Sequence, residues 1–162
     1  MNVLGTLHRI DEHRGAVRLE DVYDTGIDDL WAACTDPERL ARWIGEVTGD
    51  LAVGGTFAAA FTSGWEGKGR VEVCERPHRL LVTTWEEPGQ ESTIEATFAA
   101  EGERTRLVVE ESGVPVGQLP NYGAGWQVHA EDLAAHVAGQ ERDPAVSRWR
   151  DAVPAYEQLG VD

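Results

Sequence analysis

Three titratable side chains that could act together lie on one predicted helix. His129, Asp132 and His136 are spaced i, i+3 and i+7, which places them beside the apolar stripe of that helix. Two imidazoles and a carboxylate can bind a metal ion or transfer protons at a cavity rim. Because such a set rarely holds a metal without help from another element, a solvated helix shoulder is the alternative and we predict no metal site.

Further acidic and aromatic residues complete the candidate site. Glu66 lies in a hairpin connection that is able to cover a pocket mouth, with an exposed turn as the alternative, and Glu72 follows on the next strand. With Asp132 and His129 they are candidate general acids or bases, provided that they point inward. The candidate ligand-binding residues, for which ordinary core packing is the alternative, are Phe57, Phe61, Trp65, Trp85, Phe98, Trp126 and His129.

Motifs for nucleophilic catalysis and nucleotide binding do not stand out. Ser63 precedes Gly64, but this is not the G-x-S-x-G elbow and no histidine lies nearby in the sequence. The turn at 123–125 has two glycines but lacks the P-loop lysine and a parallel-sheet context. We therefore predict no nucleotide and no other cofactor.

The net charge argues against two classes of binding partner, nucleic acids and membrane surfaces. The 162 residues include 14 Lys or Arg and 29 Asp or Glu, for a net charge of −15. Nucleic-acid binding requires a basic surface, and a polybasic membrane patch is improbable when Lys68 is the only lysine. The 41% hydrophobic and 27% charged residues are typical of a globular protein, and the length fits one domain.

The sequence also contains no recognisable targeting signal and no cysteine motif. Residues 1–10 carry no apolar run of signal-peptide length, and no later stretch approaches the ~18 apolar residues of a membrane span, so we expect a cytoplasmic protein without membrane contact. Cys34 and Cys74 lack a CxxC partner. We expect two buried, reduced thiols.

The elements that position these residues follow from hydrophobic periodicity. Residues 14–23 read as a first strand, and 27–34 carry apolar side chains on one helical face. Asp36 and Pro37 begin a second short helix that carries Leu40, Trp43 and Ile44. From 51 to 111 the period becomes strand-like with regular turns, which predicts an antiparallel meander.

A loop and a long helix follow the meander. Residues 113–125 contain glycines and prolines and predict a loop, and a long helix begins near Ala124 and stops at Gly139. Its apolar stripe is Trp126, Ala130, Leu133 and Val137. We predict an α+β fold in which a curved antiparallel sheet of six to seven strands wraps around this long C-terminal helix and leaves a cavity, with two short helices after strand one.

The tail beyond residue 140 is expected to form a separate short helix. Asp143 and Pro144 begin it, and Pro154 ends or kinks it. Its apolar residues, Val146, Trp149 and Val153, must dock on another surface. We favour the outer side of the two short helices over a second subunit, which would make a homodimer. The predicted division is a domain at 1–140 and a tail at 141–162.

Five segments resemble a known family in order and spacing. They are Leu30–Trp43, Asp50–Phe57, Gly69–Val73, Arg79–Trp85 and Gly125-Trp126, within a resemblance that covers roughly 14–139. The chain is similar here to the heat-shock protein 90 ATPase activator homologue family. That resemblance implies the helix-grip fold of steroid-transfer-related domains and polyketide cyclases, a fold with many functions.

Three functions stay open at this point. The first is a binding domain whose cavity accepts a small hydrophobic or amphipathic molecule. The second, which the resemblance to polyketide cyclases allows, is a cyclase, dehydratase or hydrolase acting in that cavity. The third, suggested by the family's name-giving members, is a chaperone-associated interaction module, whose negative charge favours a basic partner surface.

Overall fold

All eight strands belong to one antiparallel sheet in the computed structural model, which describes residues 1–162. The order across the sheet is β1-β2-β8-β7-β6-β5-β4-β3. The strands are β1 (Gly5–Arg9), β2 (Arg14–Tyr23), β3 (Gly45–Gly49), β4 (Thr56–Phe61), β5 (Glu66–Glu75), β6 (Arg79–Trp85), β7 (Ser92–Glu101) and β8 (Arg104–Pro115). The helices are α1 (Ile27–Thr35), α2 (Pro37–Leu40), the 3₁₀ turn η1 (Val116–Gln118), α3 (Leu119–Val137) and α4 (Ala145–Leu159).

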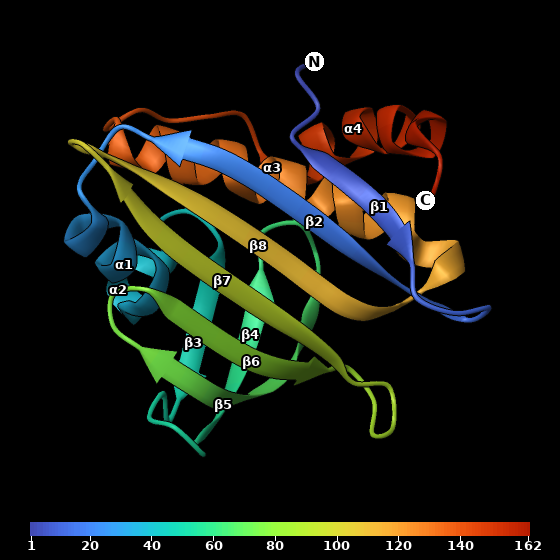
Figure 1. The fold of residues 1–162 in the computed structure, drawn as a ribbon, viewed down its shortest axis with the longest axis horizontal. Coiled ribbons are helices and arrows are strands. Elements are labelled where there is room, and N and C mark those ends of the chain that lie inside the picture. The colour runs from blue at the N-terminus through green and yellow to red at the C-terminus, as the bar shows by residue number, and fades with distance from the viewer.

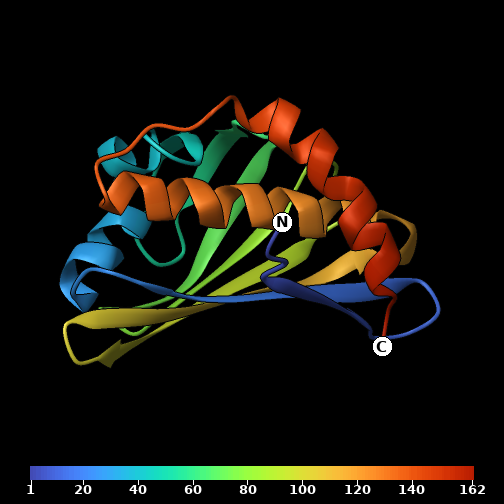
Figure 2. The same cartoon turned by 90° about the horizontal axis from the view of Figure 1, so that it is seen from above.

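The helices lie on one face of the sheet. Figures 1 and 2 show the sheet curving beneath α3, with α1 and α2 at one end and α4 beside β1. This is the α+β helix-grip arrangement expected from the sequence. The number of strands, eight rather than six to seven, corrects the prediction.

The two additional strands carry weak local signals. β1 buries Gly5 and Leu7, and it is held by pairing with β2 on one side and by two backbone hydrogen bonds with Asp162. β3 begins and ends with Gly45 and Gly49, whose φ angles of 149° and 128° favour glycine. Because glycine has low strand propensity, this strand is identified by its pairing with β4, the next strand along the chain, and not by its own sequence.

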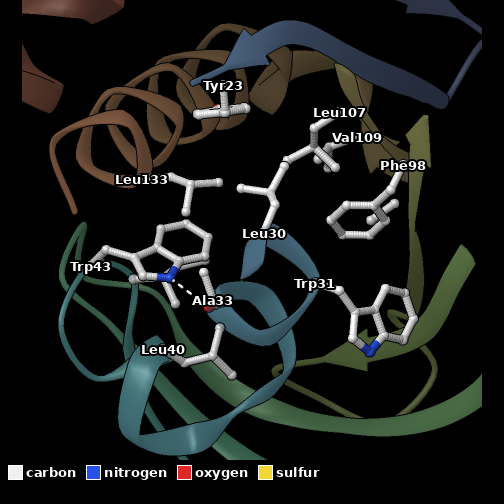
Figure 3. Packing of buried hydrophobic residues seen from close by; sticks show 12 residues of the cluster. Tyr23, Leu30, Trp31, Ala33, Leu40, Trp43, Phe98, Leu107, Val109 and Leu133 are labelled. Atoms are coloured by element: carbon white, nitrogen blue, oxygen red, sulfur yellow. Dashed lines mark hydrogen bonds between the residues drawn. The ribbon is translucent and has the colours of Figure 1, made fainter. Parts of the chain in front are cut away.

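The second short helix is shorter than predicted. Asp36 caps α2 by accepting a hydrogen bond from the Glu38 amide, and the helix ends at Leu40. Trp43 and Ile44 therefore follow it in a turn, yet both are buried. The indole of Trp43 donates a 2.8 Å hydrogen bond to the Ala33 carbonyl, which fixes the turn against α1 (Figure 3).

The expected loop at 113–125 is mostly regular structure. β8 extends to Pro115, and α3 begins at Leu119, earlier than predicted. Pro120 stands in the first turn of α3, where a helix needs no backbone donor, so the proline does not oppose the helix. The earlier start adds Asn121 and Tyr122 to the helix that faces the sheet.

Two hydrophobic clusters surround α3. The larger lies between the sheet, α1 and α2, and includes Leu30, Trp31, Phe98 and Leu133 (Figure 3). The smaller lies among β1, β2, α3 and α4, and includes Leu7, Leu119 and Tyr156. One cluster therefore packs α3 against the sheet near α1 and α2, and the other packs it near β1 and α4.

The tail helix packs on α3 and not on the two short helices. Its buried residues are Ala145, Ala152 and Tyr156. Trp149 and Val153 of the predicted apolar face pack against the smaller cluster, whereas Val146 is 39% exposed. The Tyr156 ring lies against the backbone of Gly5 and Gly123, at positions where a Cβ atom would collide with it. A second subunit is not needed to cover this face.

Pro154 does not end the tail helix, which continues to Leu159. Pro154 and Arg150 are both exposed. The Arg150 carbonyl, which loses its helical donor at the proline, therefore lies where water can reach it. No helix of the chain combines the length and the hydropathy that crossing a membrane requires.

Candidate functional site

Two adjoining cavities lie inside the grip of the sheet. The outer cavity has a volume of about 360 Å³ and the inner one about 170 Å³. Phe61, Ile94 and Trp126 line both of them. These three side chains therefore form the boundary between the two cavities.

The inner cavity is almost entirely apolar. Alternate residues of the strands point into it, among them Phe57 from β4, Val71 from β5, and Leu107 and Val109 from β8. α1 and α2 close it with Cys34 and Leu40. Thr35 is the only lining residue with a hydroxyl group. Such a wall suits the apolar body of a ligand.

The outer cavity is more polar and is bounded by α3, α4 and the ends of the strands. Its lining includes two carboxyl groups, one imidazole, several hydroxyl and amide groups, and five aromatic rings. The lining residues are Phe61, Ser63, Gly64, Trp65, Thr84, Glu86, Ile94, Glu111, Gln118, Asn121, Tyr122, Gly125, Trp126, His129 and Trp149.

Glu111 is the buried acid of this cavity, at 5% exposure. One of its oxygens accepts a 2.8 Å hydrogen bond from the Trp126 indole, and the other accepts one of 2.6 Å from the Ser92 hydroxyl. Burial raises the pKa of the Glu111 carboxyl, although both hydrogen bonds oppose that shift. Its uncharged form is therefore favoured beyond the usual range of a glutamate.

His129 is the buried base of the same cavity, at 3% exposure. Its Nε2 lies 2.9 Å from the Ser63 hydroxyl, while Nδ1 is buried without a hydrogen-bond partner. Burial, with a smaller contribution from the charge of Arg148, lowers the pKa of His129 to about 3. The imidazole is therefore neutral, and it lacks the third group that would orient a catalytic triad.

Aromatic rings form much of the remaining wall. Phe61 lies 5.0 Å from Trp65 and 5.4 Å from His129 between ring centroids. The Trp65 ring folds back over Gly67, where a Cβ atom would collide with it. α4 adds Trp149, whose indole donates a 2.9 Å hydrogen bond to the Asn121 carbonyl. The tail helix thus completes the cavity.

Five of the seven predicted ligand-binding residues line a cavity. These are Phe57, Phe61, Trp65, Trp126 and His129. Phe98 instead packs edge-on against Trp31 in the core, with ring centroids 5.2 Å apart.

Trp85 lies outside the grip. Residues 80 and 82 line the inner cavity and Thr84 lines the outer one, so Trp85, at the next position along β6, points to the opposite face. There its ring lies 5.8 Å from the Arg70 guanidinium.

The predicted acids do not reach the cavities. Glu66 is exposed, and Glu72 pairs with Arg70 on the outer face. Asp132 faces α4, where it accepts a 2.5 Å hydrogen bond from Arg148.

The three residues of the predicted cluster on α3 have three separate partners. His129 meets Ser63, Asp132 meets Arg148, and His136 accepts a 2.9 Å hydrogen bond from Arg39. No group of three or more His, Cys, Asp or Glu is arranged to hold a metal ion. The predicted cluster therefore does not assemble, and none of its members lies on a merely solvated shoulder.

Glu111 and the contact of Ser63 with His129 were not predicted from the sequence. Leu107, Val109 and Glu111 occupy alternate inward positions of β8, so a strict period of two would have identified the acid. No local signal connects residues 63 and 129. The thiols also differ from expectation: Cys34 and Cys74 are free, but Cys74 is exposed.

Comparisons with known proteins agree with this architecture. The sequence model of the family described as Activator of Hsp90 ATPase homolog 1-like protein matches residues 24–138. CalU16 from Micromonospora echinospora is 27% identical, with a TM-score of 0.79 over 96% of each chain. No curated protein sequence matches the chain.

Two further solved structures extend the comparison. DynU16, described as a protein of the dynemicin biosynthetic locus, is 28% identical, with a TM-score of 0.71 over 80% of this chain and 49% of its own. A protein from Bordetella parapertussis, 23% identical, has a TM-score of 0.73 over 99% of this chain and 94% of its own, and it shows the fold alone.

Proposed function

The chain belongs to the Activator of Hsp90 ATPase homolog 1-like family, and from this premise we propose that it binds a small hydrophobic or amphipathic molecule between the sheet and α3. The apolar body of the ligand occupies the inner cavity, and its polar group lies in the outer cavity. The ligand contacts Phe57, Phe61, Trp65, Trp126 and His129.

The observation that carries this proposal is the pair of adjoining cavities with unlike walls. The outer cavity alone, at about 360 Å³, falls within the ~300–1,000 Å³ typical of small-molecule sites. An apolar chamber beside a chamber with a few convergent polar groups is the usual composition of such sites. The relation to DynU16, whose description places that protein in a biosynthetic locus, also favours small-molecule chemistry.

Native mass spectrometry of freshly purified protein tests the proposal. We expect a reproducible mass adduct that disappears on denaturation. Ala96→Phe places a ring in the inner cavity, which Ala96 lines, and should abolish the adduct. Ala99→Phe is the matched control, since Ala99 is exposed on the same strand and should leave the adduct in place.

Other outcomes of the adduct measurement would contradict binding in the inner cavity. Loss of the adduct in both variants, or its persistence in Ala96→Phe, would show that the molecule binds elsewhere. Circular dichroism of both variants establishes that they are folded. Absence of any adduct, together with no binding of hydrophobic dyes to the wild-type protein, contradicts the proposal.

A second candidate function is acid–base catalysis in the same cavity. Glu111, whose pKa is raised by burial, and His129, whose pKa is lowered by burial, line one chamber as a candidate acid and a candidate base. Together they suit enolisation of a bound ketone, the step shared by cyclisation and dehydration. The Glu111 carboxyl donates its proton to the carbonyl oxygen, and His129 accepts the proton from the α-carbon. The low pKa of His129 makes it a weak base, so a slow reaction is expected.

Deuterium exchange tests this second candidate. In D₂O, the methyl protons of 2-acetylnaphthalene should exchange faster with the protein present than in buffer, as followed by NMR. Glu111→Gln and His129→Gln should each remove the acceleration, while Glu66→Gln, on an exposed residue, should not. Exchange at the buffer rate with the wild-type protein would exclude enolisation of this ketone.

A further inference from the structure

The outer cavity has a one-sided charge composition. Glu111 and Glu86 line it, and no lysine or arginine does. Its single imidazole, His129, is neutral because burial lowers its pKa to about 3. The only groups of the wall that can bear charge near neutral pH are therefore carboxylates, and one of them is buried.

Aromatic faces accompany the buried carboxyl group. Trp65, Trp126, Trp149, Tyr122 and Phe61 line the same cavity, and the Trp126 indole is hydrogen-bonded directly to Glu111. The π faces of such rings attract cations, and tryptophan attracts them most strongly. Aromatic rings beside a carboxylate form an environment that favours a positive group and disfavours a negative one.

We propose that the ligand of this cavity is an amine, whose ammonium group lies beside Glu111 and the aromatic rings while its apolar body extends past Trp126 into the inner cavity. This inference rests on the proposed function and specifies its ligand class. The chemistry required is a positively charged nitrogen attached to an apolar or aromatic skeleton that fits both cavities.

The outer cavity offers no favourable partner to an anionic ligand. A carboxylate or phosphate in the outer cavity finds no lysine or arginine to pair with, and burial of an unpaired charge is costly. The net charge of −15 raises the local concentration of cations near the protein and lowers that of anions. Fatty-acid-like and phosphorylated molecules are therefore the classes that this cavity rejects.

Ammonium binding is coupled to the proton of Glu111. Without a positive partner, burial favours the uncharged carboxyl group, and an ammonium group beside it favours the carboxylate. Binding should therefore release a proton, and affinity should rise with pH. The other titratable groups of the wall are Glu86, after β6, and Tyr122 and His129 on α3, while β4 and β7 add none. Protonation of His129 at low pH would repel the ammonium group, which reinforces the same trend.

Three matched probes test the charge preference by isothermal titration calorimetry: naphthalen-2-ylmethylammonium, naphthalen-2-ylmethanol and naphthalene-2-carboxylate. We expect the wild-type protein to bind the ammonium probe at least tenfold more tightly than the carboxylate, and more tightly than the alcohol. Affinity for the ammonium probe should rise from pH 5.5 to pH 8, with net proton release shown by buffers of different ionisation enthalpy.

Glu111→Gln identifies the responsible group. The glutamine oxygen can accept the Trp126 hydrogen bond and its amide can donate to Ser92, so the variant should fold, as circular dichroism will check. It should bind the ammonium probe at least tenfold more weakly, without proton release, and the alcohol within twofold of wild type. Glu110→Gln is the control, because Glu110 lies next to Glu111 on β8 but faces the other side of the sheet.

Each other outcome overturns the inference in a distinguishable way. If the alcohol or the carboxylate binds wild-type protein as tightly as the ammonium probe, the amine preference is wrong and cavity binding stands. If no probe binds but native mass spectrometry gives an adduct, the ligand class is wrong and the proposed function stands. If neither is found, both fail. Equal effects of Glu110→Gln and Glu111→Gln would show a response to overall charge and not to the cavity.

Discussion

The polar side chains on the two sides of α3 differ in whether they have partners of opposite charge. On the side that faces α4 and β1, charged side chains meet partners of opposite charge. On the side that faces the sheet, the titratable groups Glu111 and His129 meet none, and each is held toward its uncharged form. The first arrangement stabilises a helix pair, whereas the second leaves a cavity ready for another molecule.

The contacts with α4 show the first arrangement. Arg148 donates a 2.6 Å hydrogen bond to Glu131 and one of 2.5 Å to Asp132. The Tyr156 hydroxyl donates a 2.7 Å hydrogen bond to Gln127 and accepts one of 3.1 Å from the Gly5 amide. Every partner is supplied by the chain itself, so this side needs no ligand.

The largest expected loss of stability comes from removing the Tyr156 ring, which packs α4 against α3 and β1. Its ring is fully buried, so Tyr156→Ala should lower the free energy of unfolding by about 4 kcal/mol in urea denaturation. Tyr156→Phe keeps the ring and removes the two hydrogen bonds, and should cost only about 1 kcal/mol. Equal losses in the two variants would mean that the hydroxyl, and not packing, holds α4.

A smaller effect comes from acidifying the cavity side. The pKa of His129 is lowered from 6.5 to about 3, so the unfolded chain binds a proton between these values and the folded chain does not. Stability from this group is complete above pH 6.5 and is lost as pH falls, by roughly 3 kcal/mol at pH 4.5. His129→Gln should remove this component of the pH dependence of urea denaturation. An unchanged pH profile would contradict the burial of a neutral imidazole.

The ion pairs of the α4 side should contribute less than the Tyr156 ring. Arg148→Met leaves Glu131 and Asp132 without their main partner, and should lower the free energy of unfolding by about 2 kcal/mol, since the site is only partly buried. Arg142→Met is the control: Arg142 is 3.7 Å from Glu131 and 42% exposed, and its loss should cost under ~0.5 kcal/mol. If the two variants lose similar amounts of unfolding free energy, the Arg148 ion pairs contribute no more than an exposed ion pair does.

Glu111 should give the smallest stability effect, with the opposite sign of pH dependence to His129. Its raised pKa means that its contribution is complete below the unfolded pKa of ~4.3 and is lost as pH rises through the folded value. Glu111→Gln should therefore gain stability relative to wild type between pH 4 and pH 8. Hydrogen bonds from Ser92 and Trp126 limit the gain. A relative loss over this interval would mean that the carboxylate is stabilised by a positive group.

Elements with a strong local period were predictable. The helix at 27–34, the meander and the long helix all carry apolar residues at the spacing of one face, and burial of that face requires them to pack together. The order of these elements predicted an α+β fold with a curved sheet around the long helix, and the family resemblance implied that this is the helix-grip fold. Five of the seven predicted ligand-binding residues line the cavities. β3 lacks such a period and was missed, because its terminal glycines give a weak strand signal and it is held by pairing with β4, the next strand along the chain.

The sequence by itself determined which side chains share a face of an element, and hence the architecture of the sheet around α3. Tertiary structure alone decided what each face meets. His129, Asp132 and His136 lie on one helix, yet their contacts are with the β4–β5 connection, α4 and α2, respectively. Spacing along a chain fixes directions within an element. Burial, and with it pKa and partner, depends on other segments: Arg148 lies 16 residues from Asp132, and Ser63 lies 66 residues from His129.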